Sequence, residues 1–415
     1  MTFPTGRPAR LAPGAGAAAR AGAAEPPGVW AATGQLPFAG FWGRPADAAV
    51  LLADGRVLLA GGEDGRRHPT AATAVYDPAA GTWSAVGSMW TPRRLHTVTP
   101  LADGRLLAVG GIGHAPDGPA AGLATAELYD PATGRWTPTT GSLRQARFSH
   151  SATRLPDGRV LVAGGATARP GPSPHTLRSA ELYDPVTGQW TQTRPMTDAR
   201  FGHPAVPLVD GRVLLVGGVL AVGRGHYGAL GYCETYDPAT GAWTPTGTLA
   251  TARKGHQATL LADGGVLVTG GDMRGFRSDD WAFDPYSQWL TERFDPARGT
   301  WSADTDMPWG RSHHRAVLLR SGQVLVIGGT DDVSLAVGYQ NALVYDPAAR
   351  TWSTEFGTVE GRWAPAAIRL GDGRVLAAGG LTRSGPAAPV HGEDEVTATT
   401  EIYTPTTEIR TPNDG

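Results

Sequence analysis

Short apolar runs separated by turn-forming residues recur along nearly the whole chain. Residues 54–62 show the unit: an Asp-Gly-Arg turn, the apolar run Val-Leu-Leu-Ala, and a closing Gly-Gly pair. Asp-Gly favours a tight hairpin turn because glycine tolerates positive φ, and short apolar runs bounded by turns predict buried strands. A spacing of roughly 50 residues between such units is typical of propeller blades. The Gly-Gly pairs begin at Gly61, Gly110, Gly164, Gly217, Gly270, Gly328 and Gly379.

Each unit carries two further predicted strands after its Gly-Gly pair. The third strand ends in an aromatic residue, followed in six units by Asp-Pro, and the fourth strand carries a tryptophan. Proline and glycine suit successive positions of the turn between these strands. The aromatic residues are Tyr76, Tyr129, Tyr183, Tyr236, Phe294, Tyr345 and Tyr403, and the tryptophans are Trp83, Trp136, Trp190, Trp243, Trp301 and Trp352.

The seventh unit lacks a tryptophan after Tyr403, whereas Trp30 precedes the first unit. The segment after Trp30 is similar to the segments after Trp136 and Trp243. We therefore expect the first strand of the chain to be the fourth strand of the last blade, which closes the ring and removes its exposed edges. The predicted propeller spans residues 29–405, with a disordered Ala/Gly/Pro-rich tail over 1–28 and a C-terminal tail over 406–415.

The recurring Gly-Gly, Tyr-Asp-Pro and tryptophan motifs resemble the kelch-repeat family, and in particular its bacterial galactose-oxidase-like branch. The resemblance covers residues 29–405. It implies an all-β fold, a seven-bladed kelch-type β-propeller. Fold alone does not define function.

Composition narrows the range of partners. The formal net charge is −2, so no global field draws the protein to nucleic acid, and no apolar stretch is long enough to span a membrane. Cys233 is the only cysteine, which excludes an internal disulfide and is compatible with a reducing compartment. We expect a cytoplasmic protein that binds a small molecule or another protein.

An arginine opens each predicted first strand, and a histidine follows three residues later in most blades. The resemblance implies that first strands line the central channel, which would gather these residues near one mouth. A structural role is the alternative, because five blades carry a glutamate that could pair with the arginine, and buried charges need partners. Blades one and six lack this glutamate. The arginines are Arg44, Arg93, Arg147, Arg200, Arg253, Arg311 and Arg362, and the histidines are His96, His150, His203, His256 and His314.

Three neighbouring blades depart from the histidine pattern. Blade six has the doublet His313-His314, blade seven has Pro365, and blade one has Asp47. Imidazoles beside a carboxylate can act as general acid and base or hold a divalent transition metal. The predicted catalytic group is therefore His313, His314, Asp47 and Arg311, and the predicted metal ligands are His314 and His313.

The galactose oxidases hold copper with tyrosines and histidines, some of them in these same first-strand segments. His313 stands where that family has tyrosine, and Cys233 lies in a third strand instead of a first strand, where the cross-linked cysteine would be expected. No copper-radical cofactor is therefore expected. His314 is the one position that carries over as a metal ligand.

The predicted loops of blades five, six, seven and one are richer in acidic residues than those of blades two to four. Aromatic residues beside acids suit a cationic ligand. The predicted ligand-binding residues are Arg44, Arg362, His256, Asp272, Asp279, Asp280 and Trp281.

Two functions stay open. The first is a small-molecule or metal site at the channel mouth over blades five to one, with acid-base or metal-assisted catalysis as its chemistry. The second is a non-catalytic protein-protein interaction module, a common use of kelch propellers. A recessed pocket with perturbed histidines favours the first, and a flat apolar patch over several blades favours the second.

Overall fold

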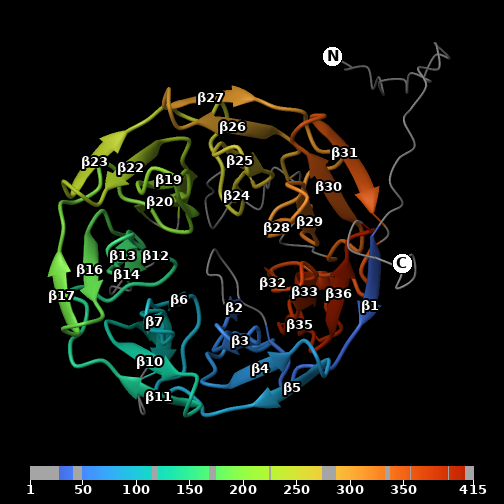
Figure 1. The fold of residues 1–415 in the computed structure, drawn as a ribbon, viewed down its shortest axis with the longest axis horizontal. Coiled ribbons are helices and arrows are strands. Elements are labelled where there is room, and N and C mark those ends of the chain that lie inside the picture. The colour runs from blue at the N-terminus through green and yellow to red at the C-terminus, as the bar shows by residue number, and fades with distance from the viewer. Residues whose placement is uncertain are drawn as a thin grey trace, which may run out of the picture.

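Seven four-stranded antiparallel sheets surround a central axis (Figure 1). The computed structural model describes residues 28–40, 49–114, 120–167, 174–223, 226–272, 287–331, 337–355, 357–390 and 392–406. In this part of the chain the one helix is a 3-10 turn, η1 (Gly385–Ala387), and no helix is long and apolar enough to cross a membrane. The predicted all-β, seven-bladed architecture is confirmed.

The blades follow one another along the chain, each running from its innermost to its outermost strand. Blade one is β2 (Ala49–Leu51), β3 (Val57–Ala60), β4 (Thr73–Asp77) and β5 (Thr82–Ala85). Blade two is β6 (Thr97–Pro100), β7 (Leu106–Val109), β10 (Ala126–Asp130) and β11 (Arg135–Pro138). Blade three is β12 (Ser151–Arg154), β13 (Val160–Ala163), β16 (Ala180–Asp184) and β17 (Gln189–Gln192). Blade four is β18 (Ala205–Pro207), β19 (Val213–Val216), β22 (Cys233–Asp237) and β23 (Ala242–Pro245).

The last three blades have the same order. Blade five is β24 (Gln257–Leu260), β25 (Val266–Thr269), β26 (Thr291–Asp295) and β27 (Thr300–Ala303). Blade six is β28 (Arg315–Leu318), β29 (Val324–Ile327), β30 (Ala342–Asp346) and β31 (Thr351–Glu355). Blade seven is β32 (Ala366–Arg369), β33 (Val375–Ala378), β36 (Thr400–Thr404) and β1 (Val29–Ala32).

The two faces of the ring carry different connections because strands alternate in direction within a blade. The turn face carries the Asp-Gly and Asp-Pro turns. The loop face carries the connections from second to third strands and from each outer strand to the next blade. Small hairpins extend the loop face, formed by β8 (Ile112–His114) with β9 (Ala120–Gly122), β14 (Ala166–Thr167) with β15 (His175–Thr176), β20 (Val219–Gly223) with β21 (His226–Ala229), and β34 (Leu381–Arg383) with β35 (Glu395–Val396).

Strand β1 closes the ring, as predicted. It pairs with β36 in blade seven, and Trp30 stands opposite Tyr403 (Figure 1). Their ring centroids lie 5.3 Å apart, close to the 5.1 Å between Tyr129 and Trp136 in blade two. Trp30 therefore takes the place that a fourth-strand tryptophan takes in the other blades. The predicted tails lie outside the described residues, apart from Gly28 and Thr406.

The second strand of every blade is buried at all its positions. Both faces of these strands pack on neighbouring blades, which explains their continuous apolar runs. Between blades two and three, for example, Leu107 and Val109 share a cluster with Val160 and Val162. Burial of each such side chain contributes about 1.5–3 kcal/mol, so contact between blades makes the ring rigid enough to position a site.

Candidate functional site

The arginines that open the first strands lie inside the blades, and the predicted pairing with glutamate is confirmed in five of them. The N···O distances are 2.6–3.0 Å in blades two to five, and Arg362 pairs with Glu401 in blade seven. Each glutamate also accepts a backbone N–H, as Glu181 does from Arg144 at 2.9 Å. These arginines have no exposed surface. They hold the blade together instead of lining a channel mouth.

Among the described residues Arg311 pairs with no carboxylate, as its sequence position predicts. Leu343 stands where the other blades have glutamate, and Arg311 donates to the carbonyls of Gly328 at 2.9 Å and Asn341 at 3.2 Å. Its guanidinium also lies 5.1 Å from the ring centre of Tyr339, a favourable cation–π arrangement. Burial lowers the pKa of Arg311 to about 10. Because Arg311 has no exposed surface, it reaches no ligand directly from this position.

The recurrent histidines are buried between blades. The Nε2 atom of His150 lies 3.0 Å from Thr97 Oγ1 of the preceding blade, and His314 Nε2 lies 2.8 Å from Thr269 Oγ1. The imidazoles also lie against the Gly-Gly pairs, where a Cβ on Gly110 would come 3.0 Å from His150 Cε1. Glycine is needed there to admit the ring. The histidines therefore join each blade to the one before it.

Burial shifts the protonation of these imidazoles. Desolvation, and then the charge of the neighbouring arginine, lowers the pKa of His96 and of His256 to about 3. The same causes, in the same order, lower the pKa of His150, His203 and His314 well below the ordinary value. A neutral imidazole can coordinate a metal, but a pKa this low makes a weak general base at neutral pH.

The residues before the histidine positions of blades two to seven form what we term the collar, at the inner edge of the ring. Backbone hydrogen bonds link the collar from blade to blade, and Ala364 N donates to His313 O at 2.7 Å while His313 N donates to Gly255 O at 2.9 Å. All described members adopt positive φ, so this backbone is architectural and His313 is not strained for a special purpose. They are Leu95, Ser149, Gly202, Gly255, His313 and Ala364, with φ between 49° and 64°.

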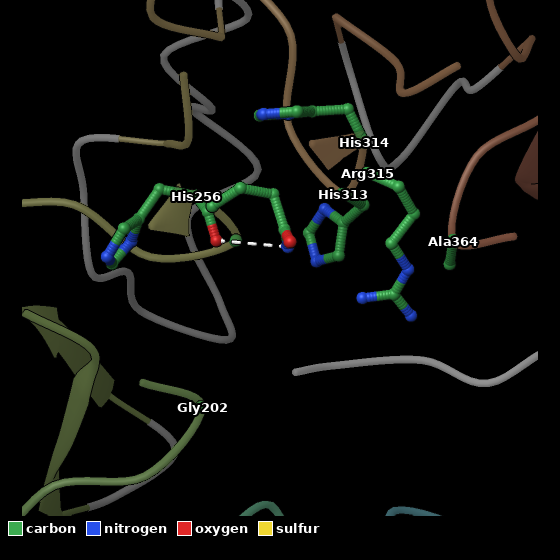
Figure 2. A pocket seen from close by; sticks show the side chains of 8 residues that line it. Gly202, His256, His313, His314, Arg315 and Ala364 are labelled. Atoms are coloured by element: carbon green, nitrogen blue, oxygen red, sulfur yellow. Dashed lines mark hydrogen bonds between the residues drawn. The ribbon is translucent and has the colours of Figure 1, made fainter. Parts of the chain in front are cut away.

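A small cavity adjoins the collar at blades four to seven. It measures about 20 Å³, room for about one water. His313 and Arg315 point toward the same space, whereas His314 points away (Figure 2). The His313 ring lies against Gly255, where a Cβ would come 2.9 Å from His313 Cε1. The lining residues are Gly202, Gly255, His256, Gln257, His313, His314, Arg315 and Ala364.

The structure brings together three of the sequence-predicted residues, His256, His313 and His314. Arg311 and Arg362 do not join them, because both are enclosed within their blades. Asp272 lies in the blade-five connection, where its backbone pairs with Lys254 and its carboxylate accepts from Ser287 Oγ at 3.4 Å. Five predicted residues lie outside the described part of the chain: Arg44, Asp47, Asp279, Asp280 and Trp281.

Sequence reasoning missed Arg315 and Gln257 in the cavity wall. Each follows the histidine position directly, where blades two and three have Thr97 and Ser151 bonded to the next imidazole. Blade seven has proline instead of that imidazole, and Arg315 Nε donates to Pro365 O at 2.6 Å. In the sequence, these two residues could have been noticed because they replace the Thr or Ser that follows the histidine in blades two and three.

The acidic loops of blades seven and one hold each other. Arg66 pairs with Glu393 at 2.8 Å and Arg67 pairs with Asp394 at 3.2 Å. The Asp394 N–H also donates to Gly65 O at 2.7 Å. These acidic side chains of blade seven are thus paired with arginines of blade one across the ring closure.

The collar residues do not fit the copper site of galactose oxidases, because His313 occupies the position of the tyrosine. Among the described residues, no group of three or more His, Cys, Asp and Glu side chains is placed to hold a metal ion. The predicted metal pair His313 and His314 points in different directions (Figure 2).

Comparison with known proteins agrees with the repeat architecture. Residues 147–197, which span blade three, match the kelch motif family. The chain is 26% identical to Kelch-like protein terF of Aspergillus terreus over 360 residues, which cover 78% of this chain and 72% of that protein. It is 28% identical to the Homo sapiens Kelch-like protein 34 over 285 residues, covering 66% of this chain but only 39% of that protein.

Solved structures share the fold at low sequence identity. A fungal alcohol oxidase of the AA5 family, determined in complex with copper, superposes with a TM-score of 0.68 at 18% identity, covering 91% of this chain and 76% of that one. This likeness concerns the fold alone. The repeats, the seven blades and the kelch relatives together identify the chain as a kelch-repeat β-propeller.

Proposed function

We propose that this kelch propeller is a protein-binding module whose partner docks on the loop face over blades five to seven. The distribution of exposed apolar side chains supports this proposal. Eight of the eleven large apolar residues exposed in the described part of the chain lie in loop-face connections, and five of the eight belong to blades five to seven; an exposed apolar patch marks an interaction site. The eight are Trp90, Val222, Tyr232, Trp289, Trp309, Val337, Val359 and Val390.

Two of these residues, Trp289 and Trp309, lie on adjoining segments and form what we term the tryptophan pair. Met307 N–H donates to Trp289 O at 2.9 Å, and Arg311 N–H donates to Gln288 O at 3.3 Å. The two tryptophans are 51% and 48% exposed. Tryptophan is enriched among the residues that dominate binding energy, so the pair is the proposed centre of the interface.

Acidic residues adjoin the tryptophan pair. Asp272 accepts a hydrogen bond from Ser287 Oγ, and the Ser287 N–H donates to Asp331 O at 3.1 Å. Ser287 is two residues from Trp289, so both acids belong to this sector. A partner with basic residues around an apolar anchor suits it, because complementary charge speeds and orients association.

The double variant Trp289→Ala/Trp309→Ala tests this proposal. The immobilised variant and the wild type are compared for proteins retained from an extract of the source cells, and a retained protein is purified and titrated against both. Loss of a dominant aromatic contact costs about 2 kcal/mol or more, roughly 30-fold in affinity. Val186→Ala on the turn face should bind like the wild type. Equal affinity of the wild type and the double variant for the purified partner would reject the tryptophan pair as the docking site.

A small-molecule or metal site at the collar is the second candidate, because His313 shares its cavity with His256 and Arg315. His313→Ala should keep the fold, since Ala364 holds the same backbone conformation in blade seven. Elemental analysis and thermal shift with divalent metals, on wild type and variant, provide the measurement. A stoichiometric metal lost from the variant supports this candidate, and equal results for both proteins oppose it.

A further inference from the structure

Arginines bridge neighbouring blades on the turn face. In five blades the arginine of the Asp-Gly-Arg turn pairs with the aspartate two residues earlier, at 2.6–2.7 Å. In three of these it also donates to the Asp-Pro turn of the next blade. The bridges run from Arg105 to Pro185 O at 3.4 Å, from Arg212 to Pro296 O at 3.2 Å, and from Arg374 to Pro78 O at 3.2 Å.

Blades five and six lack this arginine. Gly265 and Gln323 occupy its positions, and blade six also has Ser321 instead of the aspartate. Arg293, from β26 of blade five, pairs with Asp263 in its place. By the spacing of the repeat, the missing arginines would reach Pro347 and Pro405. No arginine among the described residues donates to either carbonyl. Blades six and seven are joined at other carbonyls, by Arg320 to Gly371 O and by Arg369 to Leu318 O at 2.8 Å.

A large cavity lies where the described residues form no bridge to Pro347 or Pro405. It measures about 870 Å³, within the range of small-molecule pockets. Its wall includes Pro347 and Pro405, the two carbonyl-bearing residues without an arginine, and Gln323. We call this cavity the arginine gap. It spans the clefts on both sides of blade six and lies on the face opposite the tryptophan pair.

The arginine gap contains a buried carboxylate. Glu355, at the end of β31, lines the cavity and is 8% exposed. It accepts the N–H of Gly28 at 2.9 Å, and no basic side chain of the described residues pairs with it. Burial raises the pKa of Glu355. A buried carboxylate is costly without a cation, and the lining contains three acidic residues and no Lys, Arg or His.

The charges that act on the tyrosines also distinguish the arginine gap from a cleft that holds an arginine. Burial raises the pKa of Tyr183, and the positive charge of Arg105 opposes that rise. At Tyr403, which lines the arginine gap, burial also raises the pKa, but the neighbouring charge is the negative one of Glu355, which raises it further. The cleft between blades two and three thus holds a guanidinium where the arginine gap holds none.

We propose that the arginine gap binds a guanidinium group, presented by an arginine side chain of a partner protein. Guanidinium offers five N–H donors in a planar fork that suits carboxylates and carbonyls. Arginine side chains of this chain, which extend from blades two, four and seven, already occupy the equivalent clefts. The partner arginine pairs with Glu355 and donates to the carbonyls of Pro347 or Pro405.

Titration of the full-length protein with a blocked tripeptide, Gly-Arg-Gly, tests the proposal by calorimetry. The matched control peptide has citrulline, which keeps the shape of arginine and removes its charge. We expect the citrulline peptide to bind at least tenfold more weakly. Equal affinity for the two peptides, or no detectable binding of the arginine peptide by the wild type, would overturn the proposal.

Two variants locate the site. Gln323→Arg restores the residue of the other blades, so it should fill the gap, keep or raise the melting temperature, and weaken peptide binding at least tenfold. Glu355→Gln should weaken binding by a similar factor. Val186→Ala, also on the turn face, should bind like the wild type, as should Trp289→Ala/Trp309→Ala, which separates this site from the loop-face proposal. Unchanged binding in Gln323→Arg would refute the assignment to the arginine gap.

Discussion

Lowering the pH from 7 to 5 is expected to destabilise the propeller strongly, because five imidazoles are buried in uncharged form between its blades. These are His96, His150, His203, His256 and His314. Burial holds the pKa of His96 and of His256 near 3, against an ordinary value of 6.5. Between these values the unfolded chain binds protons that the folded chain does not. Stability is therefore highest above pH 6.5 and falls as the pH drops through this window.

The magnitude follows from the protonation of the unfolded chain. At pH 5 each ordinary imidazole favours unfolding by about 2 kcal/mol. Five such groups give on the order of 10 kcal/mol, which is comparable with the whole stability of a typical domain, about 5–15 kcal/mol. The Asp residues of the Asp-Gly turns, whose pKa values are lowered, titrate below this window. Burial raises the pKa of Glu63 and of Glu355, so proton uptake by these two carboxyls as the pH falls opposes the loss that the five histidines cause.

Urea unfolding at pH 7.0, 6.0 and 5.5, followed by tryptophan fluorescence, measures the effect. His256→Leu should remove one titrating group and reduce the pH slope of the unfolding free energy by up to about 1.4 kcal/mol per pH unit. Val186→Ala, which removes no titrating group from the exposed turn face, is the control and should leave the slope unchanged. If the unfolding free energy is the same at pH 7.0 and 5.5, the imidazoles do not sit uncharged in the interior.

Two further predictions concern closure and the buried arginines. Removal of residues 1–27 should leave the melting temperature nearly unchanged, whereas removal of residues 1–35 deletes β1 and Trp30 and should cost about 3–5 kcal/mol; equal melting temperatures would disprove the closure. Arg147→Ala strands the buried Glu181 and should cost about 3–5 kcal/mol. Arg311→Ala strands only carbonyl groups and should cost less, about 1–3 kcal/mol. Equal losses in denaturant titrations would show that the carboxylate makes no difference.

The fold could be predicted because the same strand and turn motifs recur in all seven repeats of the sequence. The Gly-Gly pair, the Tyr-Asp-Pro turn and the tryptophan locate three strands of every blade. The misplaced Trp30 was enough to predict how the ring closes. The arginine–glutamate pairs could also be predicted, since both residues of a pair belong to one blade and keep a constant offset from its motifs.

The candidate site was less predictable because it depends on contacts between blades. The sequence does not reveal that His150 lies against Gly110 of the preceding blade, so the histidines could equally have lined a channel. Arg311 was singled out correctly as the arginine without a glutamate, but its burial makes it a structural residue here. Its predicted catalytic role stays a prediction. The catalytic and metal-binding roles of His313 and His314 stay predictions.

The pairing of β1 with β36 has a consequence for synthesis on the ribosome. About 370 residues separate the two strands, which takes roughly 20–75 s at typical translation rates. During this interval six blades can form in order while β1 waits without its partner. A chain that stalls before Thr400 leaves β1 and the outer edge of β33 unpaired. Such incomplete products carry open strand edges, which pair readily with other chains, so truncated translation products of this propeller are expected to aggregate where the finished protein does not.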